Sequence, residues 1–325
     1  MATAENAKLQ YEAGQNAVAM SALTDSGDHT LFTSAATLWS GKAGNAPVIR
    51  PNGLLTGGAL TTNATNNLVT VAALTCNLAG VVTSVAGASS PAITRPATNV
   101  SKVNSITVNS SGALAVVAGT DGATTAFSET RGAAGGPPLI PVGSIEIGQV
   151  RVTTSAAGLI AASEIFQVVG THVERADFPL WDTSNATGSI TFLGALPLIH
   201  TGSVPKAVYA SYSTPIFADV ALASDFVPPE TSHSISSTQV YGTTLGATSS
   251  TLGQGSFTAY LSNGVSDPLV ALKNATLWFK FFPDRYATPY ILCQGKLGIS
   301  RTFPAADSLQ AACTISASTA ATEVA

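Results

Sequence analysis

The sequence predicts a mainly β protein with tandem domains, and three observations support this prediction. Its apolar stretches are short and rich in β-branched and aromatic residues, as in strands. Segments rich in Gly, Pro, Asn and Ser separate these stretches and are typical of turns. A chain of 325 residues is also long enough for about two domains. We therefore expect tandem β-sandwich or barrel domains with one short flanking helix.

Charge is scarce in this chain. Charged residues make up 10% of the sequence, with a net charge of −4, whereas ordinary soluble proteins have about 25% charged residues. This balance argues against a protein that binds nucleic acid by neutralising phosphates. The mean hydropathy is +0.31, but no apolar run reaches about 18 residues, so no transmembrane helix is expected. A chain with so few charges is expected to bury much of its surface in an assembly.

Residues 1–45 are expected to form an N-terminal arm and entry segment. Within them, residues 5–20 favour a short helix by composition, but their weak apolar spacing leaves an extended arm open. No apolar segment typical of a secretion signal is present, so none is expected. Cys76, Cys293 and Cys313 are too few and odd in number for a disulfide framework. We expect them to be buried free thiols in a reducing compartment.

Residues 46–165 are expected to form the first β domain. Turn signals dominate residues 41–62, and residues 121–138 have the composition of an exposed loop. Strand patterns are found in four segments: 68–74, 80–87, 105–122 and 144–152. The third of these contains a Ser-Ser-Gly hairpin turn at 110–112.

Residues 166–325 are expected to form the second domain. Six segments have strand patterns: 188–199, 206–212, 256–261, 276–282, 290–299 and 309–317. The stretch 226–255 is long, rich in Ser and Thr, and nearly uncharged. Long loops in compact domains are usually functional or disordered. The composition of this one also suits an extended hairpin that reaches a neighbour.

A helix signal leads directly into a strand signal at DPLVALKNATLWFKFFPD, residues 267–284. Asp267 is expected to cap the helix through its carboxylate, which accepts a hydrogen bond from an early N–H. Pro268 suits the first helical position, where its missing donor costs nothing. The apolar face of the predicted helix, 268–275, is formed by Leu269, Val270 and Leu272.

The strand that follows, TLWFKFF, is apolar on both of its faces. Alternation places Leu277, Phe279 and Phe281 on one face, with Trp278, Lys280 and Phe282 on the other. Such a strand is expected to be covered on both sides, by the domain core and by a helix or neighbouring subunit. A stacking platform for bases or sugars is the alternative interpretation.

Two segments, 147–165 and 297–315, resemble each other at an offset of 150 residues without a gap. Identical pairs are Gly148 and Gly298, Arg151 and Arg301, Ala156 and Ala306, Leu159 and Leu309, Ala161 and Ala311, Ala162 and Ala312, and Ile165 and Ile315. Self-similarity at a fixed offset predicts a duplicated domain. The helix 268–275 has no counterpart in the first half.

Residues with catalytic or metal-binding chemistry do not form a recognised pattern. The four histidines, His29, His172, His200 and His233, match no metal-ligand spacing. The turn from Asp25 through Asp28 to His29 is more typical of a plain polar turn than of a cation site. Asp219, Asp225 and Glu230 precede His233 in sequence, but no nucleophile accompanies them. Phosphate-loop and nucleophile-elbow motifs are absent, so we expect no enzyme activity, no cofactor and no metal.

One family resemblance is carried by the C-terminal half. GQGSFTAYLSNGVSDPLVALKNATLWFKFFPD (253–284) and YILCQGKLGISRTFPAADSLQAACTISAS (290–318) resemble the tube-domain core of major tail tube proteins from long-tailed bacteriophages. The similar order is a strand, a turn at 262–264, a helix that begins with Asp-Pro, a strand, and a final hairpin with a Pro-containing bend at 303–307. FVPPETSHSISSTQVYG (226–242) is similar to the segment before the family's hairpin loop. The resemblance covers about 165–325.

The resemblance implies a structural virion protein, assembled in the host cytoplasm and located in the phage tail. Its tube domains would join their inner sheets into a continuous ring barrel, and the rings would stack. The lumen would pass double-stranded DNA, without specific binding, and the tape measure protein. Asp267, Pro268, Leu272, Phe279 and Phe281 would form the core and flank of the tube domain. Candidate inter-subunit residues are Val227, Thr231, Val240, Tyr241 and Thr251.

Two arrangements of the ring remain open. If the repeat is a real duplication, three chains form a ring with pseudo-sixfold symmetry; otherwise the first half is a decoration and six chains form the ring. TRPATNVSKVNSITVNSSGALAVVAGT (94–120) also resembles small β modules of phage tail and fibre proteins. Axial contacts would come from residues 1–30, 226–255 and 316–325. The alternative function is a fibre-like or cell-surface adhesin, which would bind a ligand rather than polymerise.

Overall fold

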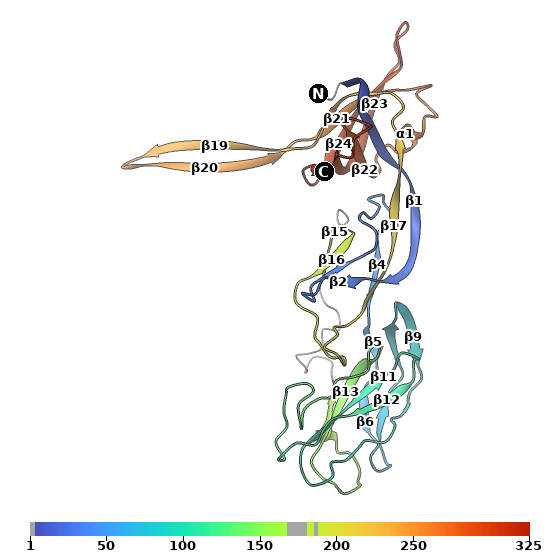
Figure 1. Ribbon diagram of the computed structural model, residues 1–325, viewed down its shortest axis with the longest axis vertical. Helices are drawn as coiled ribbons and strands as arrows, with labels where there is room; N and C mark the ends of the chain where they lie inside the picture. The colour runs from blue at the N-terminus through green and yellow to red at the C-terminus, as the bar shows by residue number, and fades with distance from the viewer. Residues whose placement is uncertain (1–3, 168–180, 185–187) are drawn as a thin grey trace. The chain divides into compact units, whose positions relative to one another are not determined.

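The computed structural model describes residues 4–167, 181–184 and 188–325 (Figure 1). Its elements are almost entirely strands, with one α-helix of a single turn and two 3-10 turns, η1 (Ala4–Asn6) and η2 (Ala162–Glu164). The predicted mainly β fold is therefore confirmed. Each sheet in the described part of the chain is open at both edges. No described sheet closes on itself, and a ring barrel joined from several copies stays a prediction.

The chain divides into two compact units. Unit 1 contains residues 1–18, 38–47 and 212–325, and unit 2 contains residues 19–37 and 48–211. These boundaries differ from the predicted ones at residues 45 and 165, because the N-terminal segment contributes strands to both units. Chain order alone does not reveal this exchange.

Unit 1 is built on one large antiparallel sheet. In spatial order its strands are β18 (Ala223–Val227), β21 (Gly255–Tyr260), β24 (Gln310–Ala317), β23 (Tyr290–Thr302), β22 (Thr276–Phe282), β1 (Lys8–Ala22) and β17 (Val208–Asp219). A short strand, β25 (Thr322–Val324), pairs with the start of β23. A two-stranded ribbon, β19 (Thr231–Val240) and β20 (Thr243–Leu252), lies between β18 and β21 in the chain. The helix α1 (Pro268–Ala271) precedes β22.

One face of this sheet holds the core of unit 1. The buried side chains on it include Phe257 on β21, Phe279 on β22, Leu297 on β23 and Ile315 on β24. Leu269 of α1 belongs to the same cluster. Side chains alternate across a strand, so the odd-numbered residues of β21 to β24 form this buried face.

The N-terminal segment is extended rather than helical. β1 pairs with β22, with Tyr11 opposite Phe279, and both of these side chains are buried. The extended alternative for residues 5–20 is therefore correct. Tertiary pairing with an apolar strand overrides the weak helix preference of Ala, Glu and Gln.

Unit 2 contains several small antiparallel sheets. The first sheet contains β2 (Thr24–Asp25), β3 (Leu31–Thr33), β16 (Ser189–Phe192) and β15 (Trp181–Ser184), and the second contains β5 (Gly53–Gly57), β8 (Leu74–Leu78) and β9 (Val81–Val85). The third sheet contains β6 (Leu60–Thr62), β7 (Val69–Val71) and β10 (Ala88–Ser89). The fourth contains β12 (Leu114–Ala118), β11 (Lys102–Val108), β13 (Ile145–Val152) and β14 (Ile165–Gln167). β4 (Val48–Pro51) pairs with the first residues of β17.

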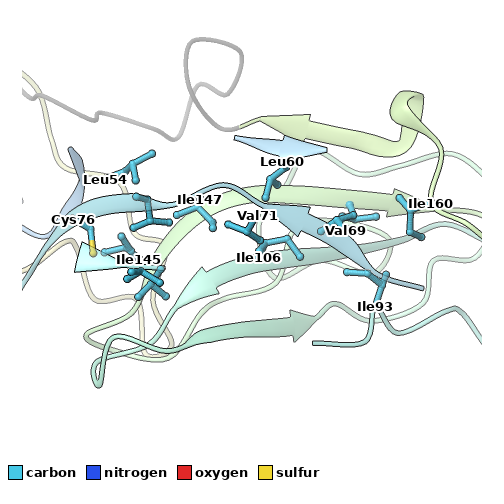
Figure 2. Close-up of a cluster of buried hydrophobic side chains, with 14 of the residues drawn as sticks. Leu54, Leu60, Val69, Val71, Cys76, Ile93, Ile106, Ile145, Ile147 and Ile160 are labelled. Atoms are coloured by element: carbon cyan, nitrogen blue, oxygen red, sulfur yellow. The ribbon is translucent and has the colours of Figure 1, made fainter. Parts of the chain in front are cut away.

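Three of these sheets share one aliphatic core, which Figure 2 shows in close-up. Leu54 from β5, Leu60 from β6, Ile106 from β11 and Ile147 from β13 all lie in it, together with Cys76. Because the sheets bury their apolar faces against one another, unit 2 has a core of its own.

The loop 121–138, predicted to be exposed, is partly buried. An Arg131 Nη2 atom lies 2.6 Å from a carboxylate oxygen of Glu146 on β13, and both side chains are almost fully buried. Arg131 also donates to the carbonyl of Pro138 at 2.5 Å. Gly136 and Pro138 are themselves buried. The prediction was wrong here because this buried ion pair ties the loop to the sheet.

Other sequence predictions were also too coarse. Residues 41–62 contain β4, β5 and β6 besides turns, and the predicted strand 188–199 ends at Phe192. The predicted helix 268–275 ends at Ala271, and Asn274 has a φ of +69°. A positive φ is incompatible with a continuing helix, so only one turn forms.

The two similar segments have related but different local structures. In each, a strand is followed by a bend and an antiparallel partner: β13 with β14, and β23 with β24. Gly148 is opposite Gln167, so the offset of 150 would place Gly298 opposite residue 317; Gly298 is instead opposite Thr314, three residues earlier. On its other side β13 pairs with β11, which is followed by β12, whereas β23 pairs with the preceding strand β22. The two segments therefore share a local strand pair but differ in its register and in the strands around it.

Candidate assembly surfaces

Strand β22 is the most deeply buried part of the unit 1 sheet. Leu277 and Phe279 are fully buried on the core face. Phe281 is half-buried on the same face, and its ring stacks on that of Phe226 with centroids 4.5 Å apart. Phe279 also contacts Phe257, with ring centroids 5.9 Å apart. Phe279 and Phe281 thus lie on the buried face that alternation predicted for them, each in contact with another aromatic ring.

The second face of β22 is covered near Trp278 by a segment of the same chain. The indole N–H of Trp278 donates to the carbonyl of Trp39 at 2.7 Å, and Trp39 stacks on Tyr212. A Cβ atom at Gly41 would lie 2.0 Å from the side-chain amide of Gln294, so the backbone approaches the sheet closely. The predicted cover was a helix or a neighbouring subunit. At Trp278 it is the segment 38–41.

A fully buried carboxylate, Glu12 on β1, fixes this segment. It accepts hydrogen bonds from the Ser40 hydroxyl, from the Trp278 backbone N–H at 3.2 Å and from the Gly41 N–H at 3.4 Å. Gln15 donates to it at 3.1 Å. A buried charge is tolerated when hydrogen bonds replace its hydration. Glu12 therefore holds segment 38–41 on the sheet.

Beyond Trp278, the second face of β22 is only half covered. The Lys280 ammonium lies 4.2 Å from the ring centroid of Phe217 and 4.9 Å from that of Tyr290. Burial lowers the pKa of Lys280. Lys8 lies over the ring of Phe282 at 5.0 Å. These cation–ring contacts stabilise side chains that remain partly open to a partner.

The helix α1 has the predicted start but a different cap. Pro268 occupies its first turn, and Leu272 at its end packs partly buried against the core. The Asp267 carboxylate does not cap the helix. It accepts instead from the backbone N–H groups of Ser262 at 2.8 Å and Gly264 at 2.6 Å. The prediction was wrong because the preceding turn folds back and offers these donors to the carboxylate.

The other face of β21, β24 and the far end of β23 is open and polar. Exposed residues on it are Lys296 and Ser300 of β23, with Ala312, Thr314 and Ser316 of β24; Ser256 and Thr258 of β21 are half-buried. Residues of adjacent strands lie side by side on this face; for example, Ser256 is opposite Thr314, which is in turn opposite Gly298. None of the side chains that these three strands place on this face is acidic. Most of its exposed side chains are small, and Lys296 and Tyr260 are the larger ones.

The ribbon β19–β20 is exposed on both of its faces. Ten residue pairs join its strands, from Thr231 opposite Leu252 to Val240 opposite Thr243. Every described side chain from Thr231 to Thr251 is exposed. No Asp, Glu, Lys or Arg occurs in it. Figure 1 shows the ribbon extending away from the other strands of unit 1.

The five candidate inter-subunit residues all lie on or beside this ribbon. Val227 ends β18 and is 51% exposed. Thr231 begins β19, Val240 ends it, and Thr251 lies on β20. Tyr241 is at the tip, where Gly242 adopts a φ of +86° that favours glycine, and its side chain is fully exposed. The structure thus gathers these residues on one projecting element.

A surface pocket lies beside β25, at the edge of the unit 1 sheet. Its volume is about 420 Å³, and its lining includes Pro283, Pro289, Tyr290, Ile291, Glu323 and Val324. Most of these side chains are apolar, and Glu323 contributes a carboxylate. The pocket can therefore accept an aromatic side chain with a polar end.

His200 and His233 are not brought together with Asp219, Asp225 or Glu230 where the structure describes them. His233 is on the exposed ribbon, and Asp219 accepts from Gln10 at 2.8 Å. His200 is buried between the carbonyls of Ser144 and Val204. Asp225 accepts from the neighbouring hydroxyl of Ser224, and Glu230 lies at the ribbon base. His172 lies outside the described residues.

In the turn from Asp25 to His29, both carboxylates already accept hydrogen bonds from the same segment of the chain. Asp28 accepts from the backbone N–H groups of Leu31 and Thr30, which lower its pKa. Asp25 accepts from the His29 ring at 2.6 Å. Across residues 4–167, 181–184 and 188–325, no group of three or more His, Cys, Asp or Glu side chains could hold a metal ion. No helix among them is long and apolar enough to span a membrane.

No protein-family model and no curated protein matches this chain.

Sequence reasoning missed the cover at 38–41 and its anchor Glu12. No local signal connects these segments, because the hydrogen bonds join residues far apart in the chain. The open polar face did have a signal. In β24 the pattern Ala311, Ala312, Cys313, Thr314, Ile315, Ser316 largely alternates apolar with small polar residues, as expected for a strand with one exposed face.

Proposed function

We propose that this protein is a structural virion protein, the major tail tube subunit of a long-tailed bacteriophage, whose copies form stacked rings around a lumen. The observation that carries the proposal is the ribbon β19–β20. Its two strands form ten residue pairs, both of its faces are exposed, and it contains no Asp, Glu, Lys or Arg. Two-stranded ribbons are marginally stable in water, and uncharged ribbons invite pairing. Such an element is best explained by docking on another copy.

The unit 1 sheet supports the same proposal. One of its faces is buried, and the other is open and free of carboxylates on β21, β23 and β24. A surface without carboxylates, on which these three strands place a single cation, Lys296, does not repel phosphates and carries too little positive charge to grip them. In the proposed tube this face lines the lumen, through which double-stranded DNA and the tape measure protein pass.

We also propose that sheets of neighbouring copies join at their edges into a ring barrel. Edge strands left unpaired are an aggregation hazard that ring closure removes. The two units have different strand orders. A ring of six copies, each with one unit 1 domain, therefore fits better than three copies with two equivalent domains. In that arrangement unit 2 is a decoration.

The proposal can be tested by electron microscopy of the purified protein, with a ribbon-deletion variant as its partner. Gly253 N–H donates to the Glu230 carbonyl at 2.9 Å, so Asn-Gly can replace residues 231–252 as a tight turn. We expect the natural chain to form rings or tubes with a central pore, and the variant to stay monomeric with an unchanged tryptophan fluorescence spectrum, since residues 231–252 contain no tryptophan.

The ring symmetry then distinguishes the arrangements. Sixfold rings agree with one tube domain per chain, and threefold rings with six similar lobes would support the duplication. Particles without a pore at any concentration contradict the tube function. Glycan binding by such particles would favour the adhesin alternative, in which unit 2, with its own core, is the binding module.

A further inference from the structure

Two features of unit 1 are complementary in shape and chemistry: the tip of the ribbon and the pocket beside β25. We propose that Tyr241 of one copy inserts into this pocket on the next copy. The inference rests on the proposed assembly function and names the contact that would drive it.

The side chain that would insert, here called the knob, is Tyr241 at the tip of the ribbon. Tyr241 is fully exposed at the two-residue turn of the ribbon. Tyr is enriched among the residues that dominate interfaces, and this one lies at the end of a projecting element. The tip is also the part of the ribbon that meets a partner first.

The pocket has the matching lining. Pro283 and Pro289 provide apolar surfaces, and Tyr290 provides an aromatic ring against which a second ring can pack. The exposed carboxylate of Glu323 can accept a hydrogen bond from the phenol hydroxyl. A second pocket, on unit 2, is lined by Leu60, Thr61, Thr62, Ala162 and Ile165. It offers neither an aromatic ring nor a carboxylate, so the pocket beside β25 is the better receptor.

A chain cannot fill its own pocket with its own tip. The Ala321 N–H donates to the Pro229 carbonyl at 2.7 Å, next to the base of the ribbon. Residues 322–324, which begin there, form β25, and its residues Glu323 and Val324 line the pocket within about 10 Å of that base. Ten strand residues carry Tyr241 about 30 Å away, and Figure 1 shows the ribbon pointing away from β23 and β24. The occupant is therefore a second copy.

This geometry has a consequence for the assembly. Knob and pocket are different surfaces of one chain, so each contact leaves a free knob and a free pocket. Such head-to-tail contacts propagate into closed rings or open filaments rather than stopping at dimers. The ribbon length would set the spacing between successive copies.

The first experiment measures the concentration at which the protein assembles, by light scattering. We expect Tyr241→Ala to raise this concentration at least about tenfold, as for a residue that dominates an interface. Tyr241→Phe, which loses only the hydroxyl, should have a smaller effect. Tyr286→Ala is the matched control, because Tyr286 is 83% exposed but lies outside the pocket lining and the ribbon. It should leave assembly unchanged.

A second experiment captures the contact itself. A Tyr241→Cys chain is mixed with a Glu323→Cys chain under mild oxidation, and a disulfide-linked heterodimer is expected. The three natural cysteines are buried and should not interfere. Tyr286→Cys in place of Glu323→Cys should give no linked product.

The outcomes separate the inference from the proposed function. If the natural chain assembles but Tyr241→Ala assembles equally well and no heterodimer forms, the knob-and-pocket contact is wrong while the tube function stands. If the natural chain does not assemble, both are wrong. If Tyr286→Ala weakens assembly as much as Tyr241→Ala, the effect is not specific to the pocket and the inference is overturned.

Discussion

Strand β22 and the ribbon β19–β20 belong to the same unit but have opposite relations to water. Leu277 and Phe279 of β22 are fully buried, whereas Ile235 of the ribbon is 80% exposed. Both elements are extended and rich in residues that favour strands. The difference is in what surrounds them: β22 is paired on both edges, while each ribbon strand is paired only with the other. Folding of a single chain pairs both edges of β22 and buries its core face, whereas both faces of the ribbon remain exposed.

The contrast predicts that the stability of unit 1 depends on β22 and its contacts, while assembly depends on the ribbon. Substitutions in β22 should change the free energy of unfolding. Substitutions in the ribbon should leave it nearly constant. Four experiments test this division.

The largest expected contrast is in thiol reactivity. Burial raises the pKa of both Cys293 and Cys313 to about 12, so at pH 8 about one thiol in ten thousand is ionised. A Ser234→Cys variant places a thiol on the exposed ribbon, where about a quarter would be ionised. We expect the ribbon thiol to react with a thiol reagent at least about a thousandfold faster than the natural ones. Comparable rates would mean that the unit 1 sheet opens readily.

The next largest effect concerns Phe279. Phe279→Ala should lower the free energy of unfolding by about 3–5 kcal/mol, because it leaves a cavity in a close-packed aromatic cluster. Phe279→Asp should prevent folding and tube formation, since a charge would be buried without a partner. Urea denaturation followed by tryptophan fluorescence measures the first effect. The control Ile235→Ala should shift stability by less than about 0.5 kcal/mol, and normal tubes from Phe279→Asp would contradict the buried position of β22.

A smaller loss is expected at Glu12. Glu12→Ala leaves the N–H groups of Trp278 and Gly41 and the Ser40 hydroxyl without their acceptor. Unpaired buried donors should lower the free energy of unfolding by about 2–3 kcal/mol. Glu12→Gln keeps one acceptor oxygen and should lose less. Denaturation midpoints measure both, and an unchanged midpoint for Glu12→Ala would show that segment 38–41 is held by other contacts.

The smallest effect is the pH dependence at Asp267. Hydrogen bonds from Ser262, with Asn263 and Gly264, hold its pKa below the ordinary value of 3.8, although burial raises it. A lowered pKa in the folded state stabilises the turn above about pH 3.8. The contribution is lost as the pH falls through the lower folded-state pKa. The protection of the Ser262 and Gly264 amides, measured relative to their intrinsic exchange rates, should therefore fall at low pH, and Asp267→Asn should abolish this pH dependence of the protection.

Several elements were predictable from sequence because their signals are local. The strand 276–282 was found with its bounds unchanged, since turn residues end a run of β-branched and aromatic side chains at Pro283. The helix was recognised by Asp-Pro, but its length was overestimated. Here Asn274 adopts a conformation that depends on its hydrogen bond to the Leu297 carbonyl, on a later strand.

The candidate surfaces were predictable in part. The sequence left two interpretations of residues 226–255, a loop or an extended hairpin, and the structure shows a hairpin. The pocket beside β25 could not be predicted, because it is lined by residues from 283–291 and 323–325 that are separated in the chain. Only strand pairing brings Tyr290 opposite Val324.

The sequence by itself determined the β character, the buried β22, the scarcity of charge and the uncharged ribbon. These follow from residue type and alternation, which act over a few neighbouring positions. Tertiary structure decided which strands pair, how the N-terminal segment is divided between two units, and which sheet face stays open. Pairing register and long-range hydrogen bonds depend on residues far apart in the chain; the bond from the Trp278 N–H to Glu12 spans 266 positions. These interactions stabilise the protein only after folding has brought their partners together, at the entropic cost of closing the intervening chain.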